Sequence, residues 1–194
     1  TTELNQFNII KNLFKHSKGE LILLLDSDDF FEKDKLKKIS NVFKEDLSKE
    51  CVCDIPKITN IKKKYKSFSY KKNINPKERW PTIFPTSTIS MRRDSFSSFL
   101  NEKFDQQFAE LAIDFRLITY FYNFRQNLSI TDQELTWYLN NNDGNESKYK
   151  KYTRRWWKRR SQSFDYLLEI LKKKNFDHDK TFDYTVTRFL NKIF

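Results

Sequence analysis

Three aspartates that follow an apolar run are the residues of this chain best suited to chemistry. Asp26, Asp28 and Asp29 lie within four positions, directly after the run at Leu21–Leu25. Close carboxylates repel one another and are costly to desolvate unless a cation compensates. Their hard oxygen atoms suit Mg²⁺ or Mn²⁺, which proteins commonly share with substrate phosphates. The structural alternative is an Asp-rich turn in which Asp29 or Asp34 caps the next helix.

The apolar run predicts the element that positions these carboxylates. A run of five aliphatic residues after a turn at Gly19 is typical of a strand buried on both faces, as in a mostly parallel sheet. Ligands of such sheets bind beyond the carboxyl ends of the strands. Apolar residues at helical spacing from Leu4 to Leu13 predict a helix before the strand, which gives the second half of a βαβ unit. Because the first strand is absent and the chain begins without Met, we expect an N-terminally incomplete piece.

Further helices and strands alternate along the chain, which predicts an α/β fold. The expected helices are at 36–47, up to Leu100, from about Trp156 to Leu171 (a basic helix) and at 182–193. The expected strands are at 50–58, which ends or lies at an edge near Pro56, within 80–91, where small residues prevail, and at 128–139. A hairpin or loop is expected at 60–79 and a loop at 140–145.

A fourth candidate aspartate lies in the stretch from 104 to 122, between the predicted helix that ends at Leu100 and the predicted strand at 128–139. The apolar spacing from Phe104 to Tyr122 continues without a break, which predicts one helix with Asp114 in its middle and Glu110 one turn earlier. On that pattern Asp114 is a surface charge paired with a base.

Composition limits the classes of protein to consider. The 194 residues suffice for one compact domain, and 38% hydrophobic with 32% charged residues indicates a folded, water-soluble chain. The net charge of +11 implies attraction to phosphate-bearing partners. Cys51 and Cys53, the only cysteines, are expected to be reduced thiols. No apolar run approaches the roughly 20 residues of a membrane span.

The basic charge gathers at the start of the long C-terminal helix. Arg154 and Arg155 stand among further lysines and arginines around Trp156-Trp157. Positive charge at a helix N-terminus opposes the helix dipole, so an anionic phosphate, lipid surface or acidic partner would compensate it. A solvated basic face is the alternative.

Three segments, in order, resemble family 2 glycosyltransferases of the GT-A fold, in their bacterial surface-polysaccharide branch. Gly19–Asp29 resembles the family's G-E-x-I-x-F-L-D-x-D-D segment, Pro85–Phe96 resembles its acceptor-side strand with R-R-x-x-F, and Phe104–Phe115 resembles its F-D-E…E-D segment. The resemblance implies a GT-A-like, mostly parallel sheet flanked by helices. It also implies that the N-terminal nucleotide-binding portion is missing, that 1–145 is the rest of the catalytic domain, and that 146–194 is a basic helical extension packed on it.

The resemblance also implies roles for individual residues. Asp28, with Asp26, would bind Mg²⁺ or Mn²⁺; Asp26 would also contact the ribose, and Asp29 would orient the donor sugar. Asp114 would be the general base and would open a helix, which requires a break in the predicted helix before it. Ile113 stands where the family usually has Glu. On the acceptor side, the resemblance places Thr86, Ser87, Thr88, Arg154 and Arg155.

The activity implied is transfer of a sugar, with inversion, from a nucleotide-diphospho-sugar to a hydroxyl of a glycan or lipid-linked acceptor. Among nucleotide sugars, a UDP-sugar is the expected donor. We expect a cytoplasmic protein with peripheral contact to the inner face of the cell membrane through the basic helix, and no nucleic-acid partner. The alternative function is a non-catalytic basic module that binds nucleic acid or anionic lipid. A nucleotidyltransferase is a third possibility, because it also uses paired aspartates, but the chain has no Gly-rich phosphate loop.

Overall fold

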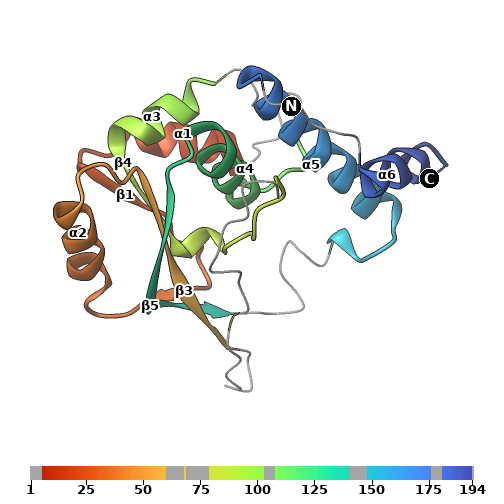
Figure 1. Ribbon diagram of the computed structural model, residues 1–194. Coiled ribbons are helices and arrows are strands. Elements are labelled where there is room, and N and C mark those ends of the chain that lie inside the picture. Colours follow the sequence, from red (N-terminus) through yellow and green to blue (C-terminus); the bar gives the residue numbers. More distant parts are fainter. Residues whose placement is uncertain are drawn as a thin grey trace.

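A mixed sheet with helices on both faces lies at the centre of the protein (Figure 1). The computed structural model describes residues 6–59, 68, 79–102, 108–139, 148–175 and 181–193. Within these ranges the sheet has five strands in the order β1-β4-β3-β5-β2. Their bounds are Leu21–Leu23 for β1, Phe30–Phe31 for β2, Cys51–Thr59 for β3, Ile89–Arg92 for β4 and Leu128–Leu139 for β5. The predicted α/β class is confirmed.

The strand directions differ from the prediction of a mostly parallel sheet. Among the described strands only β3 and β5 form a parallel pair, whereas β4 pairs antiparallel with both β1 and β3, and β2 pairs antiparallel with β5. The cause is the entry point of β4. Its first residue, Ile89, leaves the 3₁₀ turn Thr86–Thr88 beside the end of β1, so the strand must run back along β1. The small-residue strand predicted within 80–91 is present only from Ile89 onward, because Thr86–Thr88 form the 3₁₀ turn.

The first strand is also less buried than its apolar run suggests. β1 has only three residues, each of intermediate exposure, and Leu25 beyond it is 52% exposed. Of the described strands, only β4 pairs with β1, so β1 lies at the edge of the sheet. Both faces of β1 still contact apolar residues as predicted, Ile22 in one core and Leu21 and Leu23 in the other, but their burial is only partial. Pro56 behaves as predicted, because β4 pairs only with Cys51–Cys53 and the later part of β3 pairs with β5 alone among the described strands.

Alternation along β3 explains the two helical layers. Cys51 and Cys53 face a Phe-rich core, and Val52 between them faces a smaller one. The larger core packs against α1 (Gln6–His16), α3 (Arg93–Leu100), α4 (Ile113–Thr119) and α5 (Arg154–Lys173); α2 (Lys35–Glu45) covers the other face through Ile39 and Phe43. Both cysteines are buried free thiols, as predicted.

The C-terminal helices pack on this body. Tyr166 and Ile170 of α5 belong to the large core, and α6 (Phe182–Ile193) packs on α5 through a contact of Tyr184 with Phe164 (Figure 1). None of the described helices is long and apolar enough to cross a bilayer. The division of the chain at residue 145 stays a prediction. The predicted loop at 140–145 lies outside the described residues. The predicted hairpin at 60–79 also lies outside them, except for residues 68 and 79.

Candidate active site

The loop after β1 carries the three candidate carboxylates. Asp29 N donates to Asp26 O at 3.2 Å, which closes a turn. Asp26 N donates to Ser87 Oγ at 2.9 Å, so the loop is tied to the Thr86–Thr88 turn 61 residues later. The two segments that the sequence singled out separately, the aspartates and the Thr-Ser-Thr stretch, therefore form one structure.

The three carboxylates have different surroundings. Asp28 is exposed, Asp26 is of intermediate exposure, and Asp29 is 5% exposed. Asp29 Oδ1 accepts a hydrogen bond from Leu139 N at 2.9 Å, and Asp29 Oδ2 is buried without a hydrogen-bond partner among the described residues. The capping alternative is not supported, because Asp34 occupies the N-cap position of α2 and makes no side-chain cap bond.

Burial and mutual repulsion destabilise the ionised forms of Asp26 and Asp29. Burial raises the pKa of Asp26, repulsion from Asp29 and Asp28 raises it further, and a hydrogen bond with Thr86 lowers it. Burial likewise raises the pKa of Asp29, with partial compensation from hydrogen bonds with Ser87 and Leu139. Negative charge is thus held close together at a cost that a bound cation would relieve.

The residues fit a metal ion only with ligands from outside the protein. Within the described ranges, no three His, Cys, Asp or Glu side chains are placed to hold a metal by themselves. Mg²⁺ is commonly held by one or two carboxylates with substrate phosphates completing its shell. The exposed Asp28 and the destabilised carboxylate of Asp26 match that arrangement, whereas Asp29 already binds the backbone of β5.

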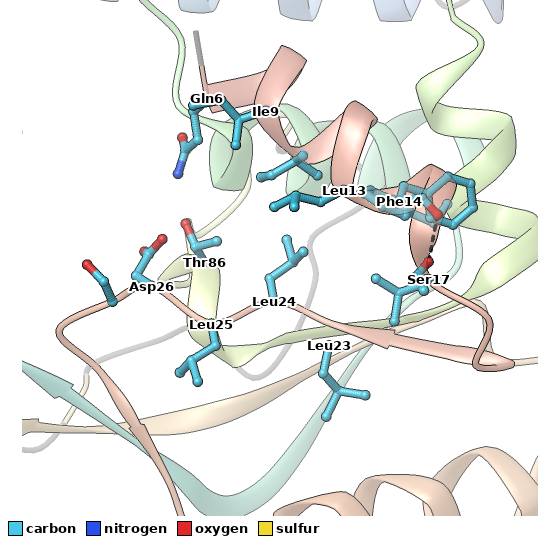
Figure 2. Close-up of a pocket in the computed structure, with 14 residues that line it drawn as sticks. Gln6, Ile9, Leu13, Phe14, Ser17, Leu23, Leu24, Leu25, Asp26 and Thr86 are labelled. Atoms are coloured by element: carbon cyan, nitrogen blue, oxygen red, sulfur yellow. Dashed lines mark hydrogen bonds between the residues drawn. The ribbon is translucent and has the colours of Figure 1, made fainter. Parts of the chain in front are cut away.

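An apolar pocket of about 470 Å³ opens beside the carboxylate loop. Figure 2 shows Gln6, Asp26 and Thr86 at one end of it and Phe14 and Ser17 at the other. The walls come from α1 and from the edge strand β1 with the residues after it, including Ile9, Leu13 and Leu25, all three of which are exposed. The polar end of the pocket thus coincides with the first of the three aspartates.

Asp114 lies in the first turn of α4, which begins at Ile113 after a non-helical segment at 108–112. The break required by the family resemblance is confirmed, and the unbroken helix that periodicity predicted was wrong. Gln6 explains where α4 begins, because its Oε1 accepts a hydrogen bond from Ile113 N at 3.1 Å. The same Gln6 lines the pocket with Asp26, so one side chain joins the end of α4 that carries Asp114 to the pocket that contains Asp26.

The three acceptor-side residues of the turn have unequal roles. Thr86, Ser87 and Thr88 are all buried. Thr86 lines the pocket and hydrogen bonds with Asp26, whereas Ser87 Oγ accepts from Asp26 N, and Thr88 Oγ1 donates to Pro85 O at 2.7 Å. The structure thus ties Thr86 and Ser87 to the carboxylate loop, and an acceptor-side role for any of the three stays a prediction.

Residues 8–100 match the profile described as Glycosyl transferase family 2. The matched stretch includes α1 from Asn8 onward, the carboxylate loop and the Thr86–Thr88 turn, which are parts that meet at the pocket. Over this stretch the chain is therefore similar to family 2 glycosyltransferases. No curated protein sequence matches it significantly.

Solved structures agree with a glycosyltransferase fold. The crystal structure of S. aureus TarS residues 1–349 in complex with UDP-GlcNAc superposes with a TM-score of 0.52 at 18% identity, over 92% of this chain and 48% of that one. The same TarS fragment in complex with UDP gives a TM-score of 0.49 at 16% identity, over 92% and 46% of the two chains. This chain therefore spans about half the length of the TarS chains it resembles.

The basic helix α5 is anchored just before Asp114. Glu110 accepts from Tyr149 Oη at 2.7 Å and from Lys158 Nζ at 3.1 Å, and Glu110 N donates to Gln162 Oε1 at 2.9 Å. Burial raises the pKa of Glu110, but these bonds and the nearby Arg155 lower it below its ordinary value overall. Arg155 is therefore close to the segment that leads into α4.

Two residues of the site were missed by sequence reasoning. Gln6 was overlooked because a glutamine at the start of an amphipathic helix carries no chemical signature. Lys35 was overlooked because it is one of many lysines, yet it is fully buried beneath the Thr86–Thr88 turn. The one available signal was its position in the first turn of α2, where positive charge is unfavourable without a special partner.

Proposed function

We propose that this chain forms the carboxylate-bearing part of a glycosyltransferase that moves a sugar from a nucleotide-diphospho-sugar to a hydroxyl acceptor. The observation that carries the proposal is the bond between Asp26 N and Ser87 Oγ, which joins the aspartate loop and the Thr-Ser-Thr turn at the mouth of one pocket. The TarS structure with UDP-GlcNAc supports a UDP-sugar as the donor.

In this proposal Asp28, with Asp26, holds Mg²⁺ or Mn²⁺ against the donor diphosphate. The metal would supply positive charge that stabilises the leaving diphosphate. Asp28 is exposed and can reach a ligand, and Asp26 has a raised pKa that a cation would lower again. Asp26 also lies at the pocket that could take the ribose, and Asp29 is proposed to orient the donor sugar.

Asp114 is proposed as the general base that removes the proton from the acceptor hydroxyl, giving inversion at the sugar carbon. Its place in the first turn of α4, held by Gln6, supports this role because the same glutamine lines the donor-side pocket. Thr86, Ser87 and Thr88, with Arg154 and Arg155 on α5, are proposed to border the acceptor. An anionic or lipid-linked glycan in surface polysaccharide synthesis would suit the basic side of the site.

We further propose a cytoplasmic location with peripheral contact to the inner face of the cell membrane. The first turn of α5 has no acidic residue; Arg154 and Arg155 are exposed there, and Lys158 is exposed in the next turn. Tyr152 is 69% exposed and packs on Trp156, with ring centroids 5.4 Å apart. Exposed aromatic rings among cations are typical of surfaces that bind the interface of anionic bilayers.

Release of sugar from UDP-GlcNAc in the presence of Mn²⁺ tests the proposed reaction. We expect slow turnover by the unmodified protein and its loss in Asp28→Ala and in Asp114→Asn. Asp94→Ala, which removes an exposed carboxylate from the first turn of α3, is the matched control and should keep full turnover. Sugar release that survives Asp28→Ala would contradict the metal role, and sugar release that survives Asp114→Asn would contradict the base.

A further inference from the structure

A buried ion pair beneath the site has no part in the proposed chemistry. The side chains of Lys35 in α2 and Asp54 in β3 are both 0% exposed, with Lys35 Nζ 2.6 Å from Asp54 Oδ1. Lys35 Nζ also donates to Ser87 O at 2.7 Å and to Thr136 Oγ1 at 2.6 Å. Thr136 Oγ1 in turn donates to Asp54 Oδ2 at 2.7 Å.

These bonds converge on the residue that holds the aspartate loop. Ser87 receives Lys35 through its carbonyl oxygen and Asp26 N through its hydroxyl. The β5 strand that carries Thr136 also carries Leu139, whose N–H binds Asp29. Lys35 is thus linked to Asp26 through Ser87 alone, and to Asp29 through Thr136 and the β5 backbone as far as Leu139. It has no direct hydrogen bond with either aspartate among those described.

Stability alone does not account for such a pair. Taking two charges out of water costs several kcal/mol per ion in general, and well-packed apolar residues of similar volume are often as stabilising. Burial lowers the pKa of Lys35 and raises that of Asp54, each opposed by the attraction of the other. A Met and a Leu would fill the same space, but they could not hold the Ser87 carbonyl at a fixed point.

We propose that Lys35, held by Asp54 and Thr136, is a positioning residue that sets the Ser87 turn and through it the geometry of the aspartate loop. The proposal builds on the function proposed above for that loop. The positioning role is separate from catalysis, because it concerns the position of the aspartate loop in the protein without donor or metal. An ammonium suits the task because it pairs with a carboxylate while it donates to a hydroxyl and a carbonyl, and these three groups come from three different elements.

Hydrogen exchange of the Asp26 and Leu139 amides tests the proposal without any ligand. The test variant is Lys35→Met/Asp54→Leu, which removes both charges together and leaves neither one buried alone. We expect both amides to exchange about tenfold faster, the change expected for loss of one hydrogen bond. The amide of Leu24, which donates to Ile89 O beside the loop, should keep its exchange rate.

Two further variants complete the experiment. Lys173→Met/Glu102→Leu removes an ion pair that joins α5 to the end of α3 and should leave all three amides unchanged. Thr136→Val keeps both charges and removes only the hydroxyl between them, so it remains informative if the double variant does not fold. It should accelerate exchange at the same two amides, by a smaller factor.

Mn²⁺ titration followed by electron paramagnetic resonance gives a second readout. We expect the double variant to bind Mn²⁺ about tenfold more weakly than the unmodified protein, because misplaced carboxylates share a cation less well. Unchanged exchange at Asp26 and Leu139 in both Lys35→Met/Asp54→Leu and Thr136→Val would overturn the positioning role. Failure of the unmodified protein to bind Mn²⁺ would instead count against the proposed metal site, and the exchange result would still decide the role of Lys35.

Discussion

At the scale of single residues, the three aspartates are not interchangeable. Asp29 is an internal group that binds the backbone of β5, Asp28 is exposed, and Asp26 lies between the pocket and the Ser87 turn. The sequence shows three carboxylates in four positions and cannot show which one is turned inward. That depends on Leu139, which is 110 residues away along the chain.

The raised pKa of Asp26 predicts a pH-dependent gain of stability in Asp26→Asn. Below the ordinary carboxyl value of 3.8 the side chain is neutral in folded and unfolded protein, so the substitution should have little effect. As the pH rises from there through the raised pKa, ionisation costs the folded state more than the unfolded one. We therefore expect the melting temperature of metal-free Asp26→Asn to exceed that of the unmodified protein at pH 7 and to match it near pH 3.5.

Thermal melts at the two pH values, without divalent cations, are the measurement. Asp94→Asn is the control because Asp94 is an exposed carboxylate in the first turn of α3, away from the three aspartates. A melting temperature that falls at pH 7 in Asp26→Asn would show that the carboxylate stabilises the apo fold, contrary to the electrostatic account of the loop.

At the scale of elements, the start of α4 at Ile113 determines where Asp114 lies. Gln6 in α1 supplies the acceptor for Ile113 N, so the first turn of α4 and the pocket wall are fixed together. Gln6→Ala should leave the fold intact and cost about 1 kcal/mol of stability, the usual worth of one hydrogen bond. If Asp114 is the base, sugar transfer should fall severalfold as its helical turn loosens.

Transfer rates and circular dichroism of Gln6→Ala and Gln6→Glu check this prediction. Glu keeps an oxygen acceptor for Ile113 N and should restore most of the rate. Asn12→Ala, an exposed change on the same helix, should have no effect. Equal rates in Gln6→Ala and Asn12→Ala would mean that this contact does not position the base.

The elements also show what sequence reasoning can and cannot reach. Helix periodicity placed α2, α3, α5 and α6 correctly, and alternation in Leu135, Trp137 and Leu139 placed β5. The strand directions could not be predicted from the sequence. The direction of β4 depends on a long-range contact, the place where the Thr86–Thr88 turn meets the end of β1. Periodicity gave the wrong result at residues 108–112, because Phe108 and Leu111 are core residues in a non-helical segment and still keep helical spacing.

At the scale of the whole molecule, charge is distributed unevenly around the site. The basic start of α5 is tied through Glu110 to the segment before Asp114, and its exposed cations include Arg154 and Arg155. Arg154→Glu/Arg155→Glu should weaken binding to vesicles that contain phosphatidylglycerol by roughly 30-fold or more, since each cation near such a surface contributes about 1 kcal/mol. Binding should also fall with added salt.

Vesicle sedimentation with and without phosphatidylglycerol is the measurement. Lys37→Glu/Lys44→Glu is the matched control, because it makes the same change in net charge at exposed positions of α2 on the opposite face of the sheet. If both double variants weaken binding equally, attraction depends on net charge alone and the α5 surface has no special role.

The central claim is that the aspartate loop and a divalent cation together hold the diphosphate of a nucleotide sugar. Calorimetric titration of UDP into the protein, with and without Mn²⁺, tests it most directly. The account predicts Mn²⁺-dependent UDP binding that is lost in Asp28→Ala and kept in Asp94→Ala. UDP binding of equal strength without Mn²⁺, or in Asp28→Ala, would contradict it.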